Sequence, residues 1–248
     1  MTTTCEPIRI AMWSGPRNIS TAMMRSFGSR ADCAVSDEPF YGAFLKASGE
    51  PHPLAEETIA DMDCDWHSVL ETQSGRAPKH QPVWYQKHMP HHMVGPVSIE
   101  DMPSHRHAFL IRAPERVVAS YRAKNELRRP EMLGFTQLRE YFDQEAERIG
   151  NAPVVVDSDT ILRDPAGTLE ALCEHLGITW DSAMLRWIEG PHPEDGVWGA
   201  HWYDKVNAST GFSGAPGELP EMDGEYQKTA EACREDYEYL AKHAIGCG

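Results

Sequence analysis

Five short apolar runs recur along the chain, each followed by polar residues and separated from the next by a longer segment. They are IRIAMW (8–13), CAVSDEP (33–39), VWYQKHM (83–89), HAFLIRA (107–113) and APVVVDS (152–158). Runs that are apolar at nearly every position are typical of strands buried on both faces. Their alternation with longer segments of helical character predicts an α/β fold, in which a central parallel sheet is flanked by helices in three layers.

Two segments carry the start and stop signals of helices. The segment 114–129 begins with a proline followed by a glutamate, both favourable in the first turn of a helix. The segment 164–177 has Asp164 where an N-cap is expected and Gly177 where the helix would end. The segment 222–245 places apolar side chains at alternating spacings of four and three residues, which predicts an amphipathic C-terminal helix.

Two stretches, 46–82 and 190–220, are rich in Pro, Gly, His and acidic residues and show no clean period. We expect both to be loop-rich insertions, the kind of segment that can cover a binding site. No internal repeat, low-complexity tract or domain boundary interrupts the pattern, so residues 1–248 are expected to form a single domain.

Composition narrows the classes of function. The 248 residues carry a formal net charge of −15, with 38 acidic against 23 basic residues. Such a surface repels nucleic acid and anionic membranes, so an anionic ligand must be held by a local cluster of donors. The six cysteines contain no Cys-x-x-Cys pair, and neither a leader nor an apolar run of membrane-spanning length is present. These features predict a soluble cytoplasmic protein with reduced thiols, and they leave its oligomeric state open.

The break after the first predicted strand carries the first candidate chemistry. It reads SGPRNIST over residues 14–21, between a buried strand and a helix. Ligands of parallel α/β sheets bind beyond the carboxyl ends of the strands, where a helix N-terminus presents free backbone N–H groups to an oxyanion. Gly15 permits the turn, Arg17 supplies a fixed charge, and Ser20 and Thr21 add hydroxyl donors. The same residues also suit a plain strand-to-helix turn with a Ser or Asn cap, and both interpretations stay open on this segment alone.

The break differs from the phosphate loop of nucleoside triphosphatases. That loop needs a Gly-Lys pair, whereas here Ile19 precedes the Ser20-Thr21 pair. A kinase or ATPase also needs a carboxylate placed for magnesium, and Asp157, after the fifth predicted strand, is the best candidate. The loop therefore indicates phosphate binding without the usual triphosphate chemistry.

The segment 107–124 repeats the order of a strand followed by a helix. Arg112 lies where the strand ends, and Ser120 follows eight residues later, about two helical turns on. An anion beside this helix can be held by a charge-assisted hydrogen bond from Arg112 and a further one from Ser120. The alternative is that Arg112 pairs with Glu115 and that Ser120 is a small packing residue.

Between the two candidate anion sites lies the histidine-rich segment VWYQKHMPHHM (83–93). We expect His88 to project from the strand end toward Arg17, where a near-neutral imidazole can take a proton from an acceptor. Lys87 can neutralise charge on a transferring group. A zinc site on these histidines is disfavoured because Pro90 breaks the spacing that metal-binding helices use, so no metal site is predicted. Four further histidines are interpreted as structural or solvated, namely His91, His92, His105 and His107.

Together these segments resemble the sulfotransferase family that uses 3′-phosphoadenosine 5′-phosphosulfate (PAPS). GPRNISTAM is similar to the family's 5′-phosphosulfate loop, and KHMP to its Lys-x-His-Leu-Pro segment, which carries the catalytic base. IRAPERVVASY looks like the 3′-phosphate motif, in which an arginine and a serine are eight positions apart. VVVDSDTILRDPAGTLEALCEHLGI resembles a later strand and helix of these enzymes. The motifs follow in the expected order and cover about residues 8–215.

Three departures from the family pattern indicate a divergent, bacterial-type branch. Asn18 and Ile19 stand in place of the usual Ser-Gly of the loop, where the backbone approaches phosphate. Lys87 is adjacent to His88 instead of two residues before it. The terminal Arg-Lys-Gly contact is not visible, and the segment DKVNASTGF takes its place with three candidate donors, Lys205, Ser209 and Thr210.

The resemblance implies a P-loop-type fold and metal-free transfer of a sulfuryl group from PAPS to a hydroxyl or amine of a small organic acceptor. It implies that His88 is the base and that Arg17 and Lys87 act on developing charge. The residues implied to hold the donor are Gly15, Arg17, Asn18, Ile19, Ser20, Thr21, Arg112, Ser120, Lys205, Ser209 and Thr210.

The acceptor is the least defined part of this interpretation. Glu38 is a candidate contact, and the ring-bearing residues of the loops suit either an acceptor pocket or plain packing. These residues are Trp66, Trp84, Trp198, His201, Trp202 and Tyr203. The alternative functions are a nucleotide-dependent small-molecule kinase, a non-catalytic nucleotide- or anion-binding protein, and a metal-dependent hydrolase.

Overall fold

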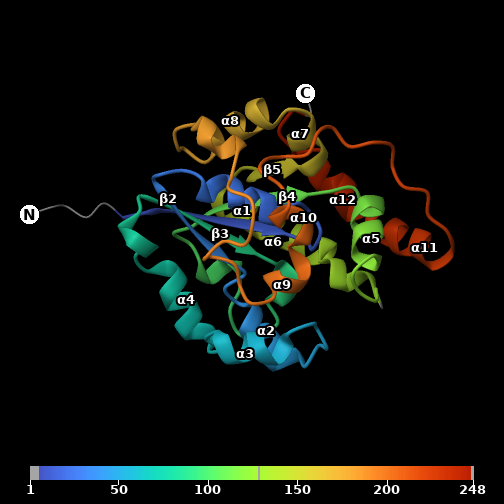
Figure 1. Cartoon of the computed structure of the whole chain (residues 1–248), viewed down its shortest axis with the longest axis horizontal. Coiled ribbons are helices and arrows are strands. Elements are labelled where there is room, and N and C mark those ends of the chain that lie inside the picture. The colour runs from blue at the N-terminus through green and yellow to red at the C-terminus, as the bar shows by residue number, and fades with distance from the viewer. Residues whose placement is uncertain (1–5, 128, 247–248) are drawn as a thin grey trace, which may run out of the picture.

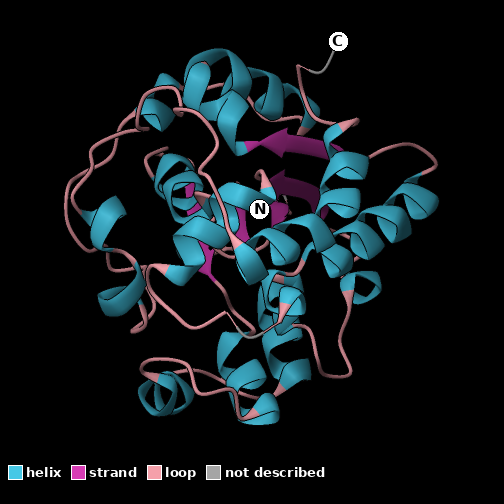
Figure 2. Cartoon of the chain, turned by 90° about the vertical axis from the view of Figure 1, so that its right-hand side faces the viewer, coloured by secondary structure: helices cyan, strands magenta, loops and turns pink. Residues whose placement is uncertain are grey.

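The computed structural model describes residues 6–127 and 129–246. Within these residues five parallel strands form one sheet in the order β2-β3-β1-β4-β5, with helices around it (Figures 1 and 2). The strands are β1 (Ile8–Ser14), β2 (Cys33–Asp37), β3 (Val83–His88), β4 (Arg106–Ile111) and β5 (Val154–Asp157). The predicted α/β class is confirmed, and each predicted strand is present with its ends shifted by at most two residues.

The α-helices of the described residues lie in three of the connections between strands and in the segment after β5. In the described part of the chain they are α1 (Ser20–Gly28), α2 (Tyr41–Ser48), α3 (Ala55–Asp61), α4 (Trp66–Ser74), α5 (Pro114–Arg122), α6 (Phe135–Ile149), α7 (Ser158–Arg163), α8 (Pro165–His175), α9 (Gly199–Trp202), α10 (Asp204–Asn207), α11 (Gly224–Ala232) and α12 (Arg234–Ala241). None of them combines the length and apolar character that crossing a bilayer requires.

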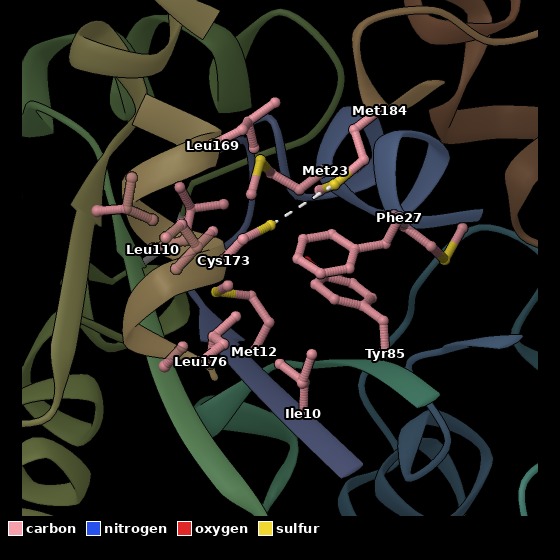
Figure 3. Close-up of a cluster of buried hydrophobic side chains, with 14 of the residues drawn as sticks. Ile10, Met12, Met23, Phe27, Tyr85, Leu110, Leu169, Cys173, Leu176 and Met184 are labelled. Atoms are coloured by element: carbon pink, nitrogen blue, oxygen red, sulfur yellow. Dashed lines mark hydrogen bonds between the residues drawn. The ribbon is translucent and has the colours of Figure 1, made fainter. Parts of the chain in front are cut away.

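One face of the sheet packs against α1 and α8. Ile10 and Met12 of β1 point to this side, and Phe27 of α1 stacks on Tyr85 of β3 with ring centroids 4.3 Å apart. Cys173 of α8 lies in the same cluster (Figure 3). Burial of these side chains is the main force that fixes α1, and with it the loop before α1, to the sheet.

The opposite face packs against α6 and α12. Side chains alternate along a strand, so the neighbours of Ile10 and Met12, Ala11 and Trp13, point to this second side. They lie in one cluster with Phe142 of α6 and Leu240 of α12. The sheet is therefore the middle of three layers, as expected.

Two of the predicted helices are present. The helix expected from 114 onward is α5, which ends at Arg122. The helix expected over 164–177 is α8, where Asp164 accepts a hydrogen bond from the Gly167 N–H at 3.0 Å, and Gly177 takes the left-handed conformation (φ 60°) that ends it.

The C-terminal segment forms two helices instead of the single one expected. α11 and α12 meet at Cys233, because the two halves pack on different partners. Ala230 and Cys233 pack against Val117 of α5, whereas Leu240 packs against α6. The apolar spacing thus marked the buried side correctly but did not reveal the change of partner.

The prediction that 46–82 is loop-rich is wrong. The end of α2 and all of α3 and α4 lie there, and Asp65 caps α4 by accepting from the N–H groups of His67 and Ser68. These helices are short, so their apolar residues complete too few turns to show a period. The segment 190–220 is mostly irregular and includes α9 and α10.

The described cysteines, Cys33, Cys64, Cys173 and Cys233, are free thiols. The other two of the six cysteines, Cys5 and Cys247, lie outside the described residues.

Candidate functional site

The loop between β1 and α1 leaves the N-terminus of α1 open. The first backbone N–H groups of a helix have no partners within the helix, and no side chain in the described residues caps this end. These N–H groups are therefore left for a ligand or water. Arg17 and Ile19 both adopt the left-handed backbone (φ 64° and 57°), which for a β-branched residue is strained by about 1–2 kcal/mol. Gly15 was expected to permit the turn, but its role is packing, because a Cβ there would collide with the carbonyl oxygen of Leu133.

The two candidate anion sites form one site. The Arg17 Nε donates to the Ser120 Oγ at 3.0 Å, and the Arg112 Nη1 donates to the Arg17 carbonyl oxygen at 2.8 Å. The alternative partner for Arg112, Glu115, pairs with Arg234. Two segments about a hundred residues apart in sequence are thereby joined at the carboxyl ends of β1 and β4.

A cavity of about 890 Å³ lies against this joined site. Gly15, Thr210 and His88 are not among its lining residues. The predicted residues that do line it are Arg17, Asn18, Ile19, Ser20, Thr21, Lys87, Arg112, Ser120, Lys205 and Ser209. Among the described residues, six basic side chains line the cavity (Arg17, Lys87, Arg112, Arg116, Lys124 and Lys205) against two carboxylates (Glu38 and Glu218). A protein with a net charge of −15 thus gathers positive charge in one hollow.

The arginines of the site are partly desolvated. Burial lowers the pKa of Arg17, and it lowers the pKa of Arg112, on which the neighbouring Arg116 and Arg17 charges act in the same direction. The buried Arg112 Nε has no hydrogen-bond partner in the described part of the chain. Because arginine stays protonated in proteins, these groups are donors that an anion would satisfy.

Arg116 and Lys124 also line the cavity and are not among the site residues predicted from the sequence. The residues Arg112, Arg116, Ser120 and Lys124 recur every four positions, and all of them line the cavity because this period keeps side chains on one side of α5 and its extension. Arg116 also donates to Asp159 at 2.9 Å, and Lys124 pairs with Asp204. A four-residue period of polar side chains after Arg112 was the signal.

The structure does not place His88 where it was expected. Its side chain is 1% exposed and stacks on Trp13 with ring centroids 4.7 Å apart, on the face of the sheet that packs against α6. Its Nε2 lies 3.2 Å from the Gln86 Oε1. Burial, then the nearby His105 and His107, lower the pKa of His88 well below its ordinary value. The prediction that His88 projects toward Arg17 is therefore wrong, because adjacent strand residues point to opposite faces and Lys87 takes the cavity side.

Lys87 is the centre of a buried ionic network. Its Nζ donates to the Asp37 Oδ1 at 2.8 Å, to the Glu38 Oε1 at 2.6 Å and to the Tyr203 hydroxyl at 2.7 Å, and that hydroxyl donates to the Asp37 Oδ2 at 2.7 Å. Burial alone would lower the pKa of Lys87, but the charges of Asp37 and Glu38 outweigh it and raise the pKa well above its ordinary value. This ammonium is held by protein carboxylates.

Glu38 presents a carboxylate to the cavity from the end of β2. Its backbone is left-handed (φ 46°), and its N–H donates to the Lys87 carbonyl oxygen at 3.0 Å. Burial raises the pKa of Glu38, although Lys87 acts in the opposite direction. A strained residue that holds a desolvated carboxylate at a cavity wall is a candidate for proton transfer.

Within the described residues, the histidines and the aspartate considered as metal or magnesium ligands do not gather into a metal-binding cluster. His91 and His92 line the cavity, and burial lowers the pKa of His91 to about 3. Among the described residues, no group of three or more His, Cys, Asp or Glu side chains is arranged to hold a metal ion. Asp157 caps α7, accepts from the Tyr237 hydroxyl at 2.9 Å and does not line the cavity.

The aromatic candidates divide into two groups. Trp198, Trp202 and Tyr203 line the cavity, whereas Trp66, Trp84 and His201 do not. The indole N–H of Trp84 donates to the Ser36 hydroxyl at 2.9 Å, at the opposite edge of the sheet from α5.

The molecule is an α/β protein with a parallel sheet, and its two strand-to-helix junctions gather arginines, hydroxyls and N–H groups that are suited to an anionic ligand. Residues 8–234 match the sulfotransferase domain family, and the chain belongs to this family. The resemblance seen in the sequence motifs is thereby confirmed.

Two solved structures share the fold. A sulfotransferase from Alicyclobacillus acidocaldarius superposes with a TM-score of 0.57 at 12% identity, over 95% of both chains. The sulfotransferase domain of the Synechococcus PCC 7002 olefin synthase gives a TM-score of 0.50 at 15% identity, over 94% of this chain and 97% of that one.

Two longer plant proteins are similar in sequence. The Arabidopsis thaliana proteins named branched-chain-amino-acid aminotransferase-like protein 1 and 2 are 37% and 35% identical over 212 residues, covering 84% and 86% of this chain. The chain spans 37% of the length of each of them.

Proposed function

We propose that the protein transfers a sulfuryl group from PAPS to a hydroxyl or amine of a small organic acceptor. The observation that carries the proposal is the contact of Arg17 with Ser120 and Arg112 beside one basic cavity. PAPS carries anionic groups on two positions of its ribose, and the cavity offers donors from two strand-to-helix junctions. Membership of the sulfotransferase domain family supports the same donor.

The donor is assigned to the basic part of the cavity. In this proposal the N-terminal N–H groups of α1 and the hydroxyls of Ser20 and Thr21 hold the 5′-phosphosulfate, while Arg17 stabilises charge on the departing phosphate. Arg112 and Ser120 hold the 3′-phosphate. Asn18 and Ile19 supply loop backbone, and Lys205 and Ser209 are further donors on the cavity wall.

The chemical step needs alignment more than covalent catalysis. The acceptor oxygen or nitrogen attacks sulfur, the bond from sulfur to the bridging phosphate oxygen breaks, and adenosine 3′,5′-bisphosphate leaves. We assign the acceptor's proton to Glu38, which takes the role first expected of His88, because Glu38 lines the cavity and His88 does not. Lys87 holds the Glu38 Oε1 in place, so its part is positioning.

The alternatives have less support. A magnesium-dependent kinase lacks its expected carboxylate, since Asp157 faces α7 and Tyr237. The name of the plant relatives carries no argument for aminotransferase activity here, because the chain spans 37% of their length. A cytoplasmic location is part of the proposal and is supported by the free thiols of the described residues.

The test compares ligands that differ in the 3′-phosphate. A ligand that binds the native state raises its melting temperature, so adenosine 3′,5′-bisphosphate should raise Tm more than ADP or ATP with magnesium. In Arg112→Ala this preference should disappear, whereas Arg122→Ala, which removes an exposed arginine of α5 outside the cavity, should keep it. Equal shifts for the three nucleotides in the wild-type protein would contradict the donor assignment. Binding without any sulfated product across acceptors would support the non-catalytic alternative.

A further inference from the structure

The cavity has a second part whose charge is opposite to that of the donor part. We name the cluster of Asp37, Glu38, Lys87 and Tyr203 the acidic end. The side chains of Asp37 and Lys87 are each 1% exposed and that of Glu38 is 9% exposed. Two carboxylates and one ammonium leave a formal charge of −1, and the most exposed of the three charged side chains is Glu38.

We propose that the acidic end binds the acceptor through a positive charge, so that the acceptor is a small organic amine bound as its ammonium ion, which gives a proton to the Glu38 Oε2 before the nitrogen attacks sulfur. This inference rests on the proposed function, because it assigns the acceptor of the same reaction.

The two oxygens of Glu38 differ in a way that points to a missing cation. Oε1 accepts from Lys87 at 2.6 Å, whereas Oε2 accepts no hydrogen bond from the described residues and lies 3.6 Å from the His92 Nδ1. Burial, and then the neighbouring His91 and His52, lower the pKa of His92 well below its ordinary value, which disfavours a positive charge on this ring. Because Glu38 lines the cavity, its Oε2 is left for a ligand, and an ammonium group at this position would donate a charge-assisted hydrogen bond to it.

The basic side chains of the cavity do not satisfy this oxygen. The charges that act most strongly on Glu38 are those of Lys87 and Asp37, and Lys87 is already shared between both carboxylates. Arg17 instead contacts Ser120, and Lys124 pairs with Asp204. The positive charge of the cavity therefore serves the donor part and leaves the acidic end uncompensated.

The walls beside Glu38 are neutral rings. Tyr41 meets Trp198 nearly at right angles (80°) with ring centroids 5.0 Å apart, and it stacks on His92 at 4.6 Å. The Tyr41 hydroxyl lies 2.8 Å from the His52 Nδ1. Rings arranged as a corner attract cations through their π systems, and by excluding water they weaken the screening of the Glu38 charge.

The experiment uses three phenols that differ in the charge of one substituent: tyramine (cationic), 4-ethylphenol (neutral) and 3-(4-hydroxyphenyl)propionate (anionic). Their affinities are measured by calorimetry on the full chain saturated with adenosine 3′,5′-bisphosphate. We expect tyramine to bind at least about tenfold more tightly than 4-ethylphenol, and the propionate to bind most weakly. In Glu38→Gln the ratio of tyramine to 4-ethylphenol should fall to about one.

The matched control is Glu147→Gln, which removes the same charge from the exposed surface of α6 and should keep the preference. Binding of adenosine 3′,5′-bisphosphate at unchanged affinity shows that each variant is folded. Equal affinities, tighter binding of the neutral or anionic phenol, no binding of any of the three, or a preference that survives in Glu38→Gln would each overturn the inference. If only the inference about the acceptor is wrong, adenosine 3′,5′-bisphosphate still binds. If adenosine 3′,5′-bisphosphate does not bind, the proposed function itself is contradicted.

Discussion

The donor part and the acidic end of the same cavity solve the problem of buried charge in opposite ways. In the donor part Arg112 keeps a buried Nε without a partner, and the N-terminus of α1 is uncapped within the described residues. At the acidic end Lys87, Asp37 and Tyr203 satisfy one another almost completely. The donor part is incomplete without a ligand, whereas at the acidic end only the Glu38 Oε2 is left for a ligand and the contacts of Lys87 with Asp37 and Tyr203 belong to the folded structure. Substitutions in the donor part should therefore affect binding, and substitution of Lys87 should affect stability.

Lowering the pH should reduce the free energy of unfolding before it changes the charge of the arginines in the donor part. Burial lowers the pKa values of His105 and His107 to about 4, against an ordinary value near 6.5. Between these values the unfolded chain binds a proton that the folded chain does not. The contribution of these two histidines to the free energy of unfolding should therefore be complete above about pH 6.5. It should fall toward pH 4 by up to about 1.4 kcal/mol per pH unit for each histidine.

Urea unfolding at pH 7, 6 and 5 measures this dependence. His107→Gln should make the fall with pH shallower. A free energy of unfolding that does not change over this range would show that these histidines are accessible to protons in the folded state.

Removal of the ammonium at the acidic end should be strongly destabilising. Lys87→Met leaves Asp37 and Glu38 as two buried carboxylates without their cation, which costs roughly 3–5 kcal/mol. Thermal and urea unfolding measure this loss, and Lys79→Met, at an exposed lysine, is the control with little expected change. The double variant Asp37→Asn with Lys87→Met should recover part of the stability. Wild-type stability in Lys87→Met would remove the contrast between the two parts.

The donor part should show the reverse behaviour. Arg17→Ala removes a charged donor and should weaken binding of adenosine 3′,5′-bisphosphate by roughly 10- to 100-fold, since a hydrogen bond to a charged group contributes about 1.5–3 kcal/mol. The free energy of unfolding of this variant should change little. Arg17 is partly exposed, and the substitution removes its part-buried hydrogen bond to Ser120 without leaving a charge unpaired. Calorimetric titration gives the affinity, and a stability loss as large as that of Lys87→Met would count against the comparison.

The smallest effect on turnover is expected at His88. His88→Gln loses the stacking on Trp13, which contributes roughly 1 kcal/mol to stability, but should keep turnover within about threefold. Glu38→Gln, by contrast, should lower turnover by roughly 100-fold or more if Glu38 accepts the proton. The rate of adenosine 3′,5′-bisphosphate release measures both. An inactive His88→Gln that still binds nucleotide would return the base to His88.

Much of the fold could be predicted because it is local. The five apolar runs became the five described strands, and the Asp164 cap and Gly177 marked α8 at both ends. The short helices of 46–82 were missed because seven to nine residues give too little periodicity. In the site, Arg112 and Ser120 were recognised from an eight-residue spacing, whereas Arg116 between them was passed over.

The sequence by itself determined which residues follow the strands, and therefore which groups gather at the carboxyl edge of a parallel sheet. Only the tertiary structure decided which of them meet, because that depends on strand order and register. β2 lies beside β3 with Asp37 opposite Lys87, which puts a carboxylate next to the lysine. β1 lies on the other side of β3 with Trp13 opposite His88, and the shared face buries the imidazole against the indole. Two adjacent residues thus enter different environments because the strand turns one toward the cavity and the other toward the core.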